Sequence, residues 1–391
     1  MNTLERSIIE LVKSGIDGSK AVISEDVDWE KLIQICKTHK LVPLVYYGII
    51  NSDIKVSNSL LNDLKSMVFR NVVVDQRQLL ELSQLQKQFD NYNIDYMPLK
   101  GILLKYLYPR TEMRPMGDGD ILIKMSQRQK VKEIMLEMGY EEGKETYHEL
   151  VFKKPNIYVE LHKCLIPSYN KDYYSYYGDG WKLARKINQS SSCYSMSDED
   201  QLIFLFTHFA KHYRDGGISV LHLIDIWVYL NSKNISNDYV IQELSKLQLD
   251  RFYNNILSTL EVWFNNGDET KITEFITNRM FNNGCWGTQD TNYIATAVKT
   301  TKSSSVRGIK VKRIINVIFP SVAFMKFRYP VLQKCKYLLP VTWIMRWIET
   351  IILKPQNLKA AGKALNNTTE ENVIAYQNEL NYVGLDFNFE E

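Results

Sequence analysis

The sequence predicts an α+β fold in which a small mixed-sheet core, residues 91–195, lies between helical regions at 1–90 and 196–391. Apolar residues repeat at helical spacing before and after the core, whereas short strand-like and helix-like runs alternate within it. The 391 residues are too many for one ordinary core, so two or three domains are expected. Apolar residues make up 45% and charged residues 24%, as in average globular proteins.

The N-terminal region ends in an amphipathic helix, which the run "DQRQLLELSQLQKQFDNY" predicts. Its apolar residues recur at roughly helical spacing, with Gln and Lys between them. They are Leu79, Leu82, Leu85 and Phe89. Asparagines at 91 and 93 then break the pattern and predict the start of the core.

The core opens with a short strand, 94–99, and a helix over 102–108 that a proline ends. The run "DILIK", 120–124, has the composition of a second strand. Ser126 is placed to cap a helix that ends at Gly139 and whose apolar residues recur at i, i+3, i+4 and i+7. Those apolar residues are Val131, Ile134, Met135 and Met138.

Residues 147–163 predict a β-hairpin with Lys154, Pro155 and Asn156 in its turn. Side chains alternate between the faces of its second strand. One face then carries Tyr158, Glu160 and His162, and the other carries Ile157, Val159 and Leu161.

The C-terminal region returns to helical patterns. One helix is expected from a cap at Ser197 to Gly216–Gly217, and a second over 218–231. The segment 305–354 contains ten Lys or Arg residues and one acidic residue among many large apolar side chains. Its prolines predict several short helices. Its cations are expected to cover helical surface, with a phosphate backbone or an anionic membrane as alternatives.

Several classes of protein are excluded. The five scattered cysteines contain no CxxC pair, which argues against a disulfide framework or a zinc ribbon and favours reduced thiols. The start, "MNTLERSIIELVKSG", lacks the apolar block of a secretory signal. No stretch reaches the ~18 uncharged apolar residues that span a bilayer. A net charge of +3 does not by itself indicate nucleic acid. The expectation is a cytoplasmic protein without a transmembrane segment.

Two aspartates lie at the start of the 120–124 strand, in the run "RPMGDGDILIK". An extended backbone places Asp118 and Asp120 on the same side, about 7 Å apart. Like charges this close require a cation or donor, and Mg²⁺ prefers one or two carboxylates plus substrate phosphates. If the hairpin pairs with this strand, Glu160 completes a three-carboxylate cluster that can hold two ions.

The upstream run "PLKGILLKYLY" predicts a strand, a glycine and then a helix N-terminus, where free N–H groups favour an anion. Gly101 has no Cβ and so permits close approach of a phosphate, and Lys100 adds a positive charge. A phosphate cradle followed by metal-binding carboxylates indicates a nucleotide site.

This arrangement resembles the nucleotidyltransferase fold of the DNA polymerase β superfamily, with its glycine, its acidic-x-acidic strand and a third carboxylate on a neighbouring strand. The chain is also similar to an uncharacterised bacterial nucleotidyltransferase family. The motifs that match are "THKLVPL" (38–44), "LKG" (99–101), Arg114, "DGD" (118–120), "ELH" (160–162), "THFAKH" (207–212) and "LIDIW" (223–227).

The resemblance implies a nucleotidyltransferase-type core and transfer of a nucleoside monophosphate from an NTP to an acceptor hydroxyl, with release of pyrophosphate. The implied catalytic and metal-binding residues are Asp118, Asp120 and Glu160, with Mg²⁺ or alternatively Mn²⁺. The implied nucleotide-binding residues are Lys100, Gly101, Arg114 and His162. The acceptor would be a small molecule, a glycan precursor or a protein.

Two alternatives stay open. One is a nucleotide-binding interaction protein without catalysis, since Ile102, Gly119 and Glu160 depart from the residues common in the superfamily. The other is a transferase that acts on RNA ends through a basic cluster, whose residues would be Lys310, Lys312 and Arg313.

Two further pairs of polar residues lie at helical spacing in the C-terminal region. His208 and His212 have the i, i+4 spacing of a metal pair but lack the glutamate of an HExxH site, so hydrogen-bonded histidines are favoured, with a contact to nucleotide or acceptor as an alternative. His222 and Asp225, at i, i+3, are expected to pair with each other.

Overall fold

The computed structural model describes residues 1–146, 148–215, 217–282, 315, 318–329, 331–353 and 369–385. These residues form two compact units. The first contains residues 1–211 and 218–282, and the second contains 212–215, 217 and the described residues from 315 onward. All of the predicted site residues lie in the first unit.

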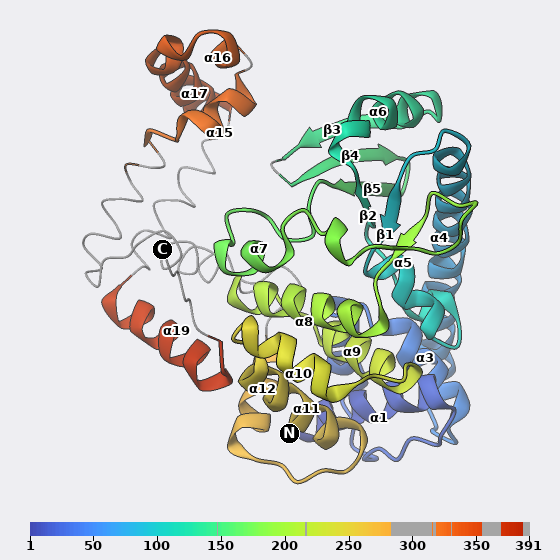
Figure 1. Ribbon diagram of the computed structural model, residues 1–391. Coiled ribbons are helices and arrows are strands. Elements are labelled where there is room, and N and C mark those ends of the chain that lie inside the picture. The colour runs from blue at the N-terminus through green and yellow to red at the C-terminus, as the bar shows by residue number, and fades with distance from the viewer. Residues whose placement is uncertain are drawn as a thin grey trace. The chain divides into compact units, whose positions relative to one another are not determined.

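Four helices form the N-terminal region: α1 (Thr3–Asp17), α2 (Trp29–Thr38), α3 (Val42–Asn51) and α4 (Asn58–Asn91) (Figure 1). The side chains of Asn2 and Glu5 cap α1 reciprocally. α1 and α3 cross closely at Gly15 and Gly48. A methyl group on either glycine would overlap a backbone carbonyl of the other helix, so the crossing requires both glycines. The predicted helical character of this region is confirmed.

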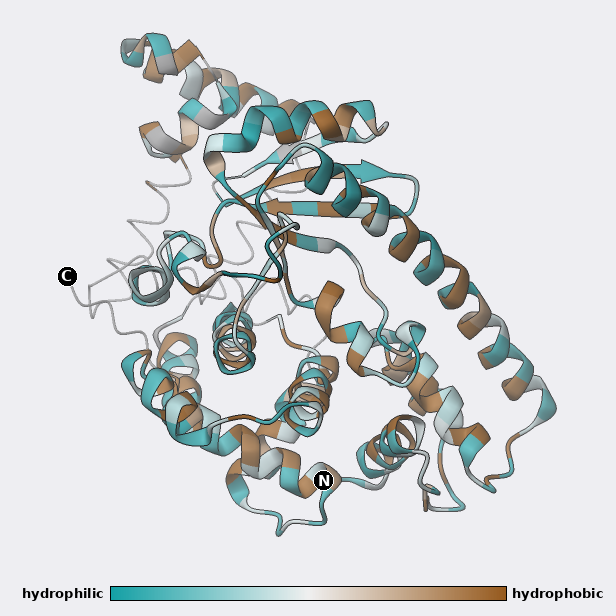
Figure 2. Cartoon of the chain, turned by 45° about the vertical axis from the view of Figure 1, so that its right-hand side comes forward, coloured by the Kyte–Doolittle hydropathy of each residue, from teal (hydrophilic) through white to brown (hydrophobic). Residues whose placement is uncertain are grey.

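α4 contains the amphipathic helix that the sequence predicts. It runs for 34 residues, and Figure 2 shows brown apolar bands alternating with teal polar ones along it. Leu82, Leu85 and Phe89 are buried in the core of the sheet, whereas Leu79 is only partly buried. The helix ends at Asn91, and Asn93 has a positive φ of 51°.

The central sheet has five strands: β1 (Tyr96–Pro98), β2 (Gly119–Ile123), β3 (Glu141–Glu145), β4 (Glu149–Lys154) and β5 (Ile157–His162). Their order is β1-β2-β5-β4-β3, in which β2 and β5 are parallel and the other neighbours are antiparallel. The parallel register places Asp120 opposite Glu160. The predicted mixed sheet and the pairing of the hairpin with the aspartate strand are therefore confirmed.

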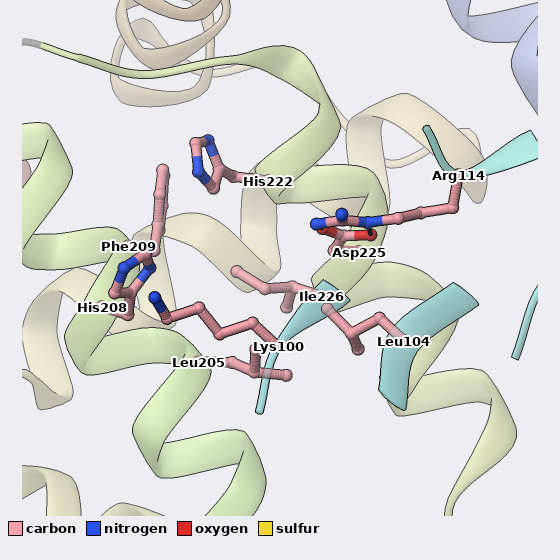
Figure 3. Close-up of a pocket in the computed structure, with 9 residues that line it drawn as sticks. All are labelled: Lys100, Leu104, Arg114, Leu205, His208, Phe209, His222, Asp225 and Ile226. Carbon is pink, nitrogen blue, oxygen red and sulfur yellow. Dashed lines mark hydrogen bonds and ion pairs between the residues drawn. The ribbon is translucent and has the colours of Figure 1, made fainter. Parts of the chain in front are cut away.

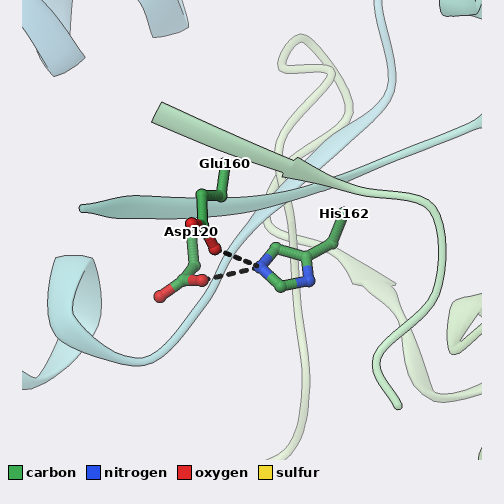
Figure 4. A group of neighbouring side chains, drawn as sticks. All are labelled: Asp120, Glu160 and His162. Carbon is green, nitrogen blue, oxygen red and sulfur yellow. Dashed lines mark hydrogen bonds and ion pairs between the residues drawn. The ribbon is translucent and has the colours of Figure 1, made fainter. Parts of the chain in front are cut away.

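Alternation along β5 sorts its side chains as predicted. Ile157, Val159 and Leu161 belong to an apolar cluster that includes residues of α4 and of α6 (Arg128–Glu137). Glu160 and His162 point to the opposite side of the sheet (Figure 4). One face therefore forms the core, and the other is left for polar chemistry.

The structure corrects two local predictions. The helix expected over 102–108 is a short α5 (Gly101–Leu104) followed by a 3₁₀ turn, Lys105–Leu107. Ser126 does not cap α6, because it lies inside another 3₁₀ turn, Met125–Gln127, and no side chain caps the helix. Instead, the Gln127 side chain bonds to the backbone of the segment before β1, which fixes this turn against the sheet.

Helices dominate the following part of the chain: α7 (Lys171–Tyr177), α8 (Asp198–Asp215), α9 (Val220–Ser232), α10 (Asn237–Lys246), α11 (Asp250–Phe264) and α12 (Lys271–Asn282). A small sheet pairs β6 (Arg185–Lys186) with β7 (Tyr194–Ser195). The predicted cap at Ser197 is confirmed, since its hydroxyl accepts the N–H of Asp200. Gly216, at the predicted end of α8, lies outside the described residues.

The second unit includes α15 (Val322–Arg328), α16 (Val331–Lys334), α17 (Leu339–Leu353) and α19 (Glu370–Val383). Pro320 precedes α15, whereas Pro340 lies in the first turn of α17 and does not interrupt it. The basic cluster suggested for RNA, Lys310, Lys312 and Arg313, lies outside the described residues. Within the described ranges, none of the helices combines the length and apolarity required to cross a bilayer.

Candidate functional site

The candidate site lies where β2 and β5 run in parallel. Asp120, Glu160 and His162 each present a ligand atom, and these atoms lie within 4.8 Å of one another (Figure 4). Asp120 and His162 are buried, whereas Glu160 is half-buried and remains accessible. Two carboxylates and an imidazole converge because the register aligns Asp120 with Glu160 and Leu122 with His162.

Asp120 is held by two donors. Its Oδ1 accepts a hydrogen bond from Lys100 Nζ at 2.9 Å and another from His162 Nε2 at 2.6 Å. Burial alone would raise the pKa of Asp120, but Lys100 and His162 outweigh burial and hold the pKa well below its usual range. No hydrogen bond reaches Oδ2 from any residue that the structure describes, so this oxygen is available to a ligand.

His162 orients Asp120 rather than Glu160. Its Nε2 lies 2.6 Å from Asp120 but 3.9 Å from the Glu160 carboxylate. Burial and the nearby Lys100 charge lower the pKa of His162, which favours a neutral ring that donates through Nε2. Its buried Nδ1 has no hydrogen-bond partner among the described residues.

Asp118 lies one residue before β2, outside the tight group formed by Asp120, Glu160 and His162. Burial and the negative charge of Asp120 raise the pKa of Asp118, against the opposing charges of Lys100 and Lys40. Asp118 therefore shares the electrostatic environment of the site without contributing to its closest cluster.

The environment of Glu160 disfavours its ionised carboxylate. Burial, followed by the negative charges of Asp118, Glu149 and Asp120, raises the pKa of Glu160 to about 8. A bound cation would relieve this repulsion and favour the ionised carboxylate.

Lys100 occupies a strained turn. The Leu99 carbonyl accepts the N–H of Ile102, and Lys100 between them has φ 44° and ψ −116°. These are the dihedral angles of the first central residue of a type II′ turn, a position that glycine prefers. Such strain costs about 1–3 kcal/mol and concentrates at functional sites. Here the turn directs the Lys100 amine to Asp120.

Gly101 makes room for a side chain. A Cβ at this position would lie 2.8 Å from Arg114 Nη1 and 3.1 Å from two atoms of Met116. Arg114 cannot easily move away, because its Nε and Nη2 donate to the carboxylate of Asp225 at 3.2 and 2.8 Å. The glycine is therefore required for packing of the guanidinium as well as being a candidate for phosphate approach.

Gly101→Ala is expected to destabilise the protein by about 1–3 kcal/mol, because the added methyl group overlaps a pinned side chain. The free energy of unfolding in denaturant would measure this effect. Gly117→Ala is the matched control, since its Cβ would meet only Lys40 Nζ, at 3.5 Å, and should change stability by less than about 0.5 kcal/mol. Equal effects of the two substitutions would contradict this packing role.

A small pocket that has both polar and apolar lining adjoins Lys100. Its lining comes from the connection between β1 and β2 and from α8 and α9: Lys100, Leu104, Arg114, Leu205, His208, Phe209, His222, Asp225 and Ile226. Figure 3 shows Lys100 reaching toward His208 while Arg114 lies against Asp225. The "THFAKH" and "LIDIW" segments therefore help to form the surroundings of the site.

The predicted histidine pairs have different outcomes. Asp225 pairs with Arg114 and accepts the Tyr108 hydroxyl, and His222 Nδ1 accepts the N–H of Ser219. Asp225 acts on His222 electrostatically, and a direct pair between them stays a prediction. Burial lowers the pKa of His222 to about 4, and its ring stacks on Phe209. Within the described ranges, the group of potential metal ligands includes neither His208 nor His212.

Sequence reasoning missed Lys40, which the N-terminal helices bring to the site. Its Nζ lies 3.5 Å from the position of a Cβ on Gly117, and its charge lowers the pKa of Asp118. Lys40 follows α2 with φ 60°, and the N–H of Leu41 bonds to the Cys36 carbonyl. Glycine usually occupies such a left-handed position. The signal that the sequence offered was the run "THKLVPL" (38–44), which contains Lys40.

Comparison with known families gives one match. The profile of a family described as an uncharacterised nucleotidyltransferase matches residues 25–265, more than half of the chain. This range contains the carboxylate cluster, Lys40, Lys100 and the Arg114–Asp225 pair. No curated protein and no solved structure matches the chain.

Proposed function

The chain belongs to this family of uncharacterised nucleotidyltransferases, and we propose that it transfers a nucleoside monophosphate from an NTP to an acceptor hydroxyl, releasing pyrophosphate. The observation that carries the proposal is the parallel pairing of β2 with β5, which sets Asp120 against Glu160 beside Lys100. Acidic and basic groups thus meet on the polar side of the sheet, as a metal–triphosphate complex requires.

The donor set fits a divalent cation. Asp120 Oδ2 is available, Glu160 is half-buried, and the raised pKa of Glu160 reports the charge repulsion that a cation relieves. Asp120 and Glu160 would hold Mg²⁺ or Mn²⁺, with Asp118 as a third carboxylate. The bound ion would neutralise charge on the triphosphate and activate the acceptor hydroxyl.

The remaining residues act on the phosphates and on the carboxylates. Lys100 bonds to Asp120, and both Lys100 and Lys40 act electrostatically on Asp118, so these two charges would stabilise the charge of the triphosphate. The N–H of Gly101, which forms no hydrogen bond with described residues, would donate to a phosphate oxygen. His162 would keep Asp120 in place. Arg114, bound to Asp225, would position the Lys100–Gly101 turn.

The full-length protein should be incubated with each α-labelled NTP, Mg²⁺ or Mn²⁺, and cell extract. Transfer of label from one NTP to a component of the extract is the expected result. The same NTP should bind more weakly when metal is omitted. Binding of the metal–NTP complex without any transfer would favour the non-catalytic interaction protein over the enzyme.

Binding of Mg²⁺ is expected to tighten by about fivefold from pH 7 to pH 8, because Glu160 must lose its proton to become a ligand. Since folding raises the pKa of Glu160, the metal-free fold loses stability as pH rises from about 4.5 to about 8. Thermal unfolding with and without Mg²⁺ across this range measures both effects. Glu160→Gln should flatten the pH dependence, whereas Glu142→Gln on β3 should leave it intact.

Lys40→Gly is expected to weaken NTP binding by about tenfold while leaving stability unchanged or up to about 1 kcal/mol higher. The reason is that glycine adopts φ 60° without strain but removes the charge beside Asp118. Titration with metal–NTP and denaturant unfolding would separate the two effects. Unchanged binding, or a large loss of stability, would assign Lys40 to the fold instead of the site.

A further inference from the structure

The outward face of α17 is apolar. Six side chains recur at i, i+3, i+4, i+7, i+10 and i+11, so they lie within an arc of about 120° around the helix. They are Val341, Ile344, Met345, Ile348, Ile351 and Ile352, and each is 47–68% exposed. These six residues are termed the α17 stripe. Most helices of water-soluble proteins direct such a stripe toward the core.

The opposite face of α17 is already packed. The rings of Trp343 and Trp347 meet Phe319 edge to face, with centroids 5.0 and 5.4 Å apart. Their indole N–H groups donate to the carbonyls of Pro320 and Ile318 at 3.1 and 2.7 Å. Rotation of the stripe inward would break these contacts, so the helix is held with its aliphatic face outward.

The surroundings of α17 are basic. Between 318 and 353 the described residues include five cations, Lys326, Arg328, Lys334, Lys336 and Arg346, and one acid, Glu349, which gives a net charge of +4. Glu349 pairs with Arg328 at 2.6 Å. Lys334 and Lys336 are exposed, as is Tyr337 at 93%. An exposed aliphatic stripe in a cationic segment is complementary to a surface that is both apolar and anionic.

We propose that the α17 stripe binds the surface of a bilayer containing anionic lipids. Its aliphatic side chains would enter the boundary of the acyl chains while the neighbouring cations attract the headgroups. The 15 residues of α17 extend about 22 Å, less than a hydrocarbon core of about 30 Å, so the helix would lie along the surface. The stripe offers no aromatic faces for stacking of bases, which favours lipid over nucleic acid.

Flotation of the full-length protein with vesicles tests this proposal. Vesicles of equal parts phosphatidylcholine and phosphatidylglycerol should carry the protein, and vesicles of phosphatidylcholine alone should carry much less. Ile344→Ser with Ile348→Ser should lower partitioning at least about tenfold. Lys334→Gln with Lys336→Gln should lower partitioning about fivefold for each lysine that contacts the vesicle surface. Phe69→Ser, at an exposed apolar position on α4, is the matched control and should bind normally.

Three outcomes would overturn the proposal. The first is an absence of binding to anionic vesicles. The second is binding that survives both Ile344→Ser with Ile348→Ser and Ile351→Ser with Ile352→Ser. The third is a protein that does not bind vesicles but either self-associates or retains a single-stranded RNA, when the stripe substitutions abolish that association or retention. Unfolding curves of each variant show that it is folded, and NTP binding by the same samples reports separately on the nucleotide site.

Discussion

Asp120→Asn should reduce label transfer by at least about a hundredfold, while the protein stays folded. The substitution preserves the shape of the side chain, and an amide oxygen can still accept hydrogen bonds from Lys100 and His162. It removes the negative charge that a divalent cation requires, and with it the electrostatic stabilisation of the transferring phosphate. Initial rates with saturating NTP and metal would measure the loss.

The matched control for this substitution is Glu142→Gln on β3. Glu142 belongs to the same sheet but pairs with Lys132 at 2.7 Å, away from the carboxylate cluster. Its transfer rate should stay within about twofold of the original protein, since exposed ion pairs contribute little. Transfer at the normal rate by Asp120→Asn would refute the proposed site.

Asp225→Ala should produce the largest loss of stability, about 3–5 kcal/mol. Its carboxylate accepts two hydrogen bonds from Arg114 and one, at 2.7 Å, from the Tyr108 hydroxyl. The side chains of Arg114 and Asp225 are only 15% and 6% exposed, so removal of the carboxylate leaves a buried, uncompensated guanidinium. The free energy of unfolding in denaturant is the appropriate measurement.

A double substitution distinguishes loss of the pair from loss of packing. Arg114→Met with Asp225→Leu should recover at least half of the lost stability, because two apolar side chains carry no unpaired charge. Asp53→Ala, which breaks an exposed ion pair with Lys20, should cost less than about 0.5 kcal/mol. A double variant as unstable as Asp225→Ala would show that shape, rather than charge, dominates at this position.

Local sequence patterns predicted much of the fold. Alternation in "IYVELHK" placed Ile157, Val159 and Leu161 in the core and Glu160 on the polar side, because a strand has a period of two. The run of leucines predicted the amphipathic part of α4, and Asn91 predicted its end. These features depend on neighbours within a few residues, so the chain encodes them directly.

The local patterns failed where the backbone departs from regular geometry. Ser126 has the residue type of a helix cap but lies in a 3₁₀ turn, since Gln127 bonds to the backbone of Asp95 and Asn93. Lys100 occupies a dihedral region that its residue type disfavours, held there by its bond to Asp120. In both cases tertiary contacts override local preference.

By itself, the sequence determined the mixed sheet, its flanking helices and the residue types from which a metal–nucleotide site could be built. Only the tertiary structure decided which of these residues meet: Asp120 with Glu160 and His162, Lys40 beside Asp118, and Arg114 with Asp225. The physical reason is that such contacts join residues that are between 40 and 111 positions apart in the sequence and belong to separate segments of the chain. Periodicity specifies the face on which a side chain lies, but register and packing choose its partner.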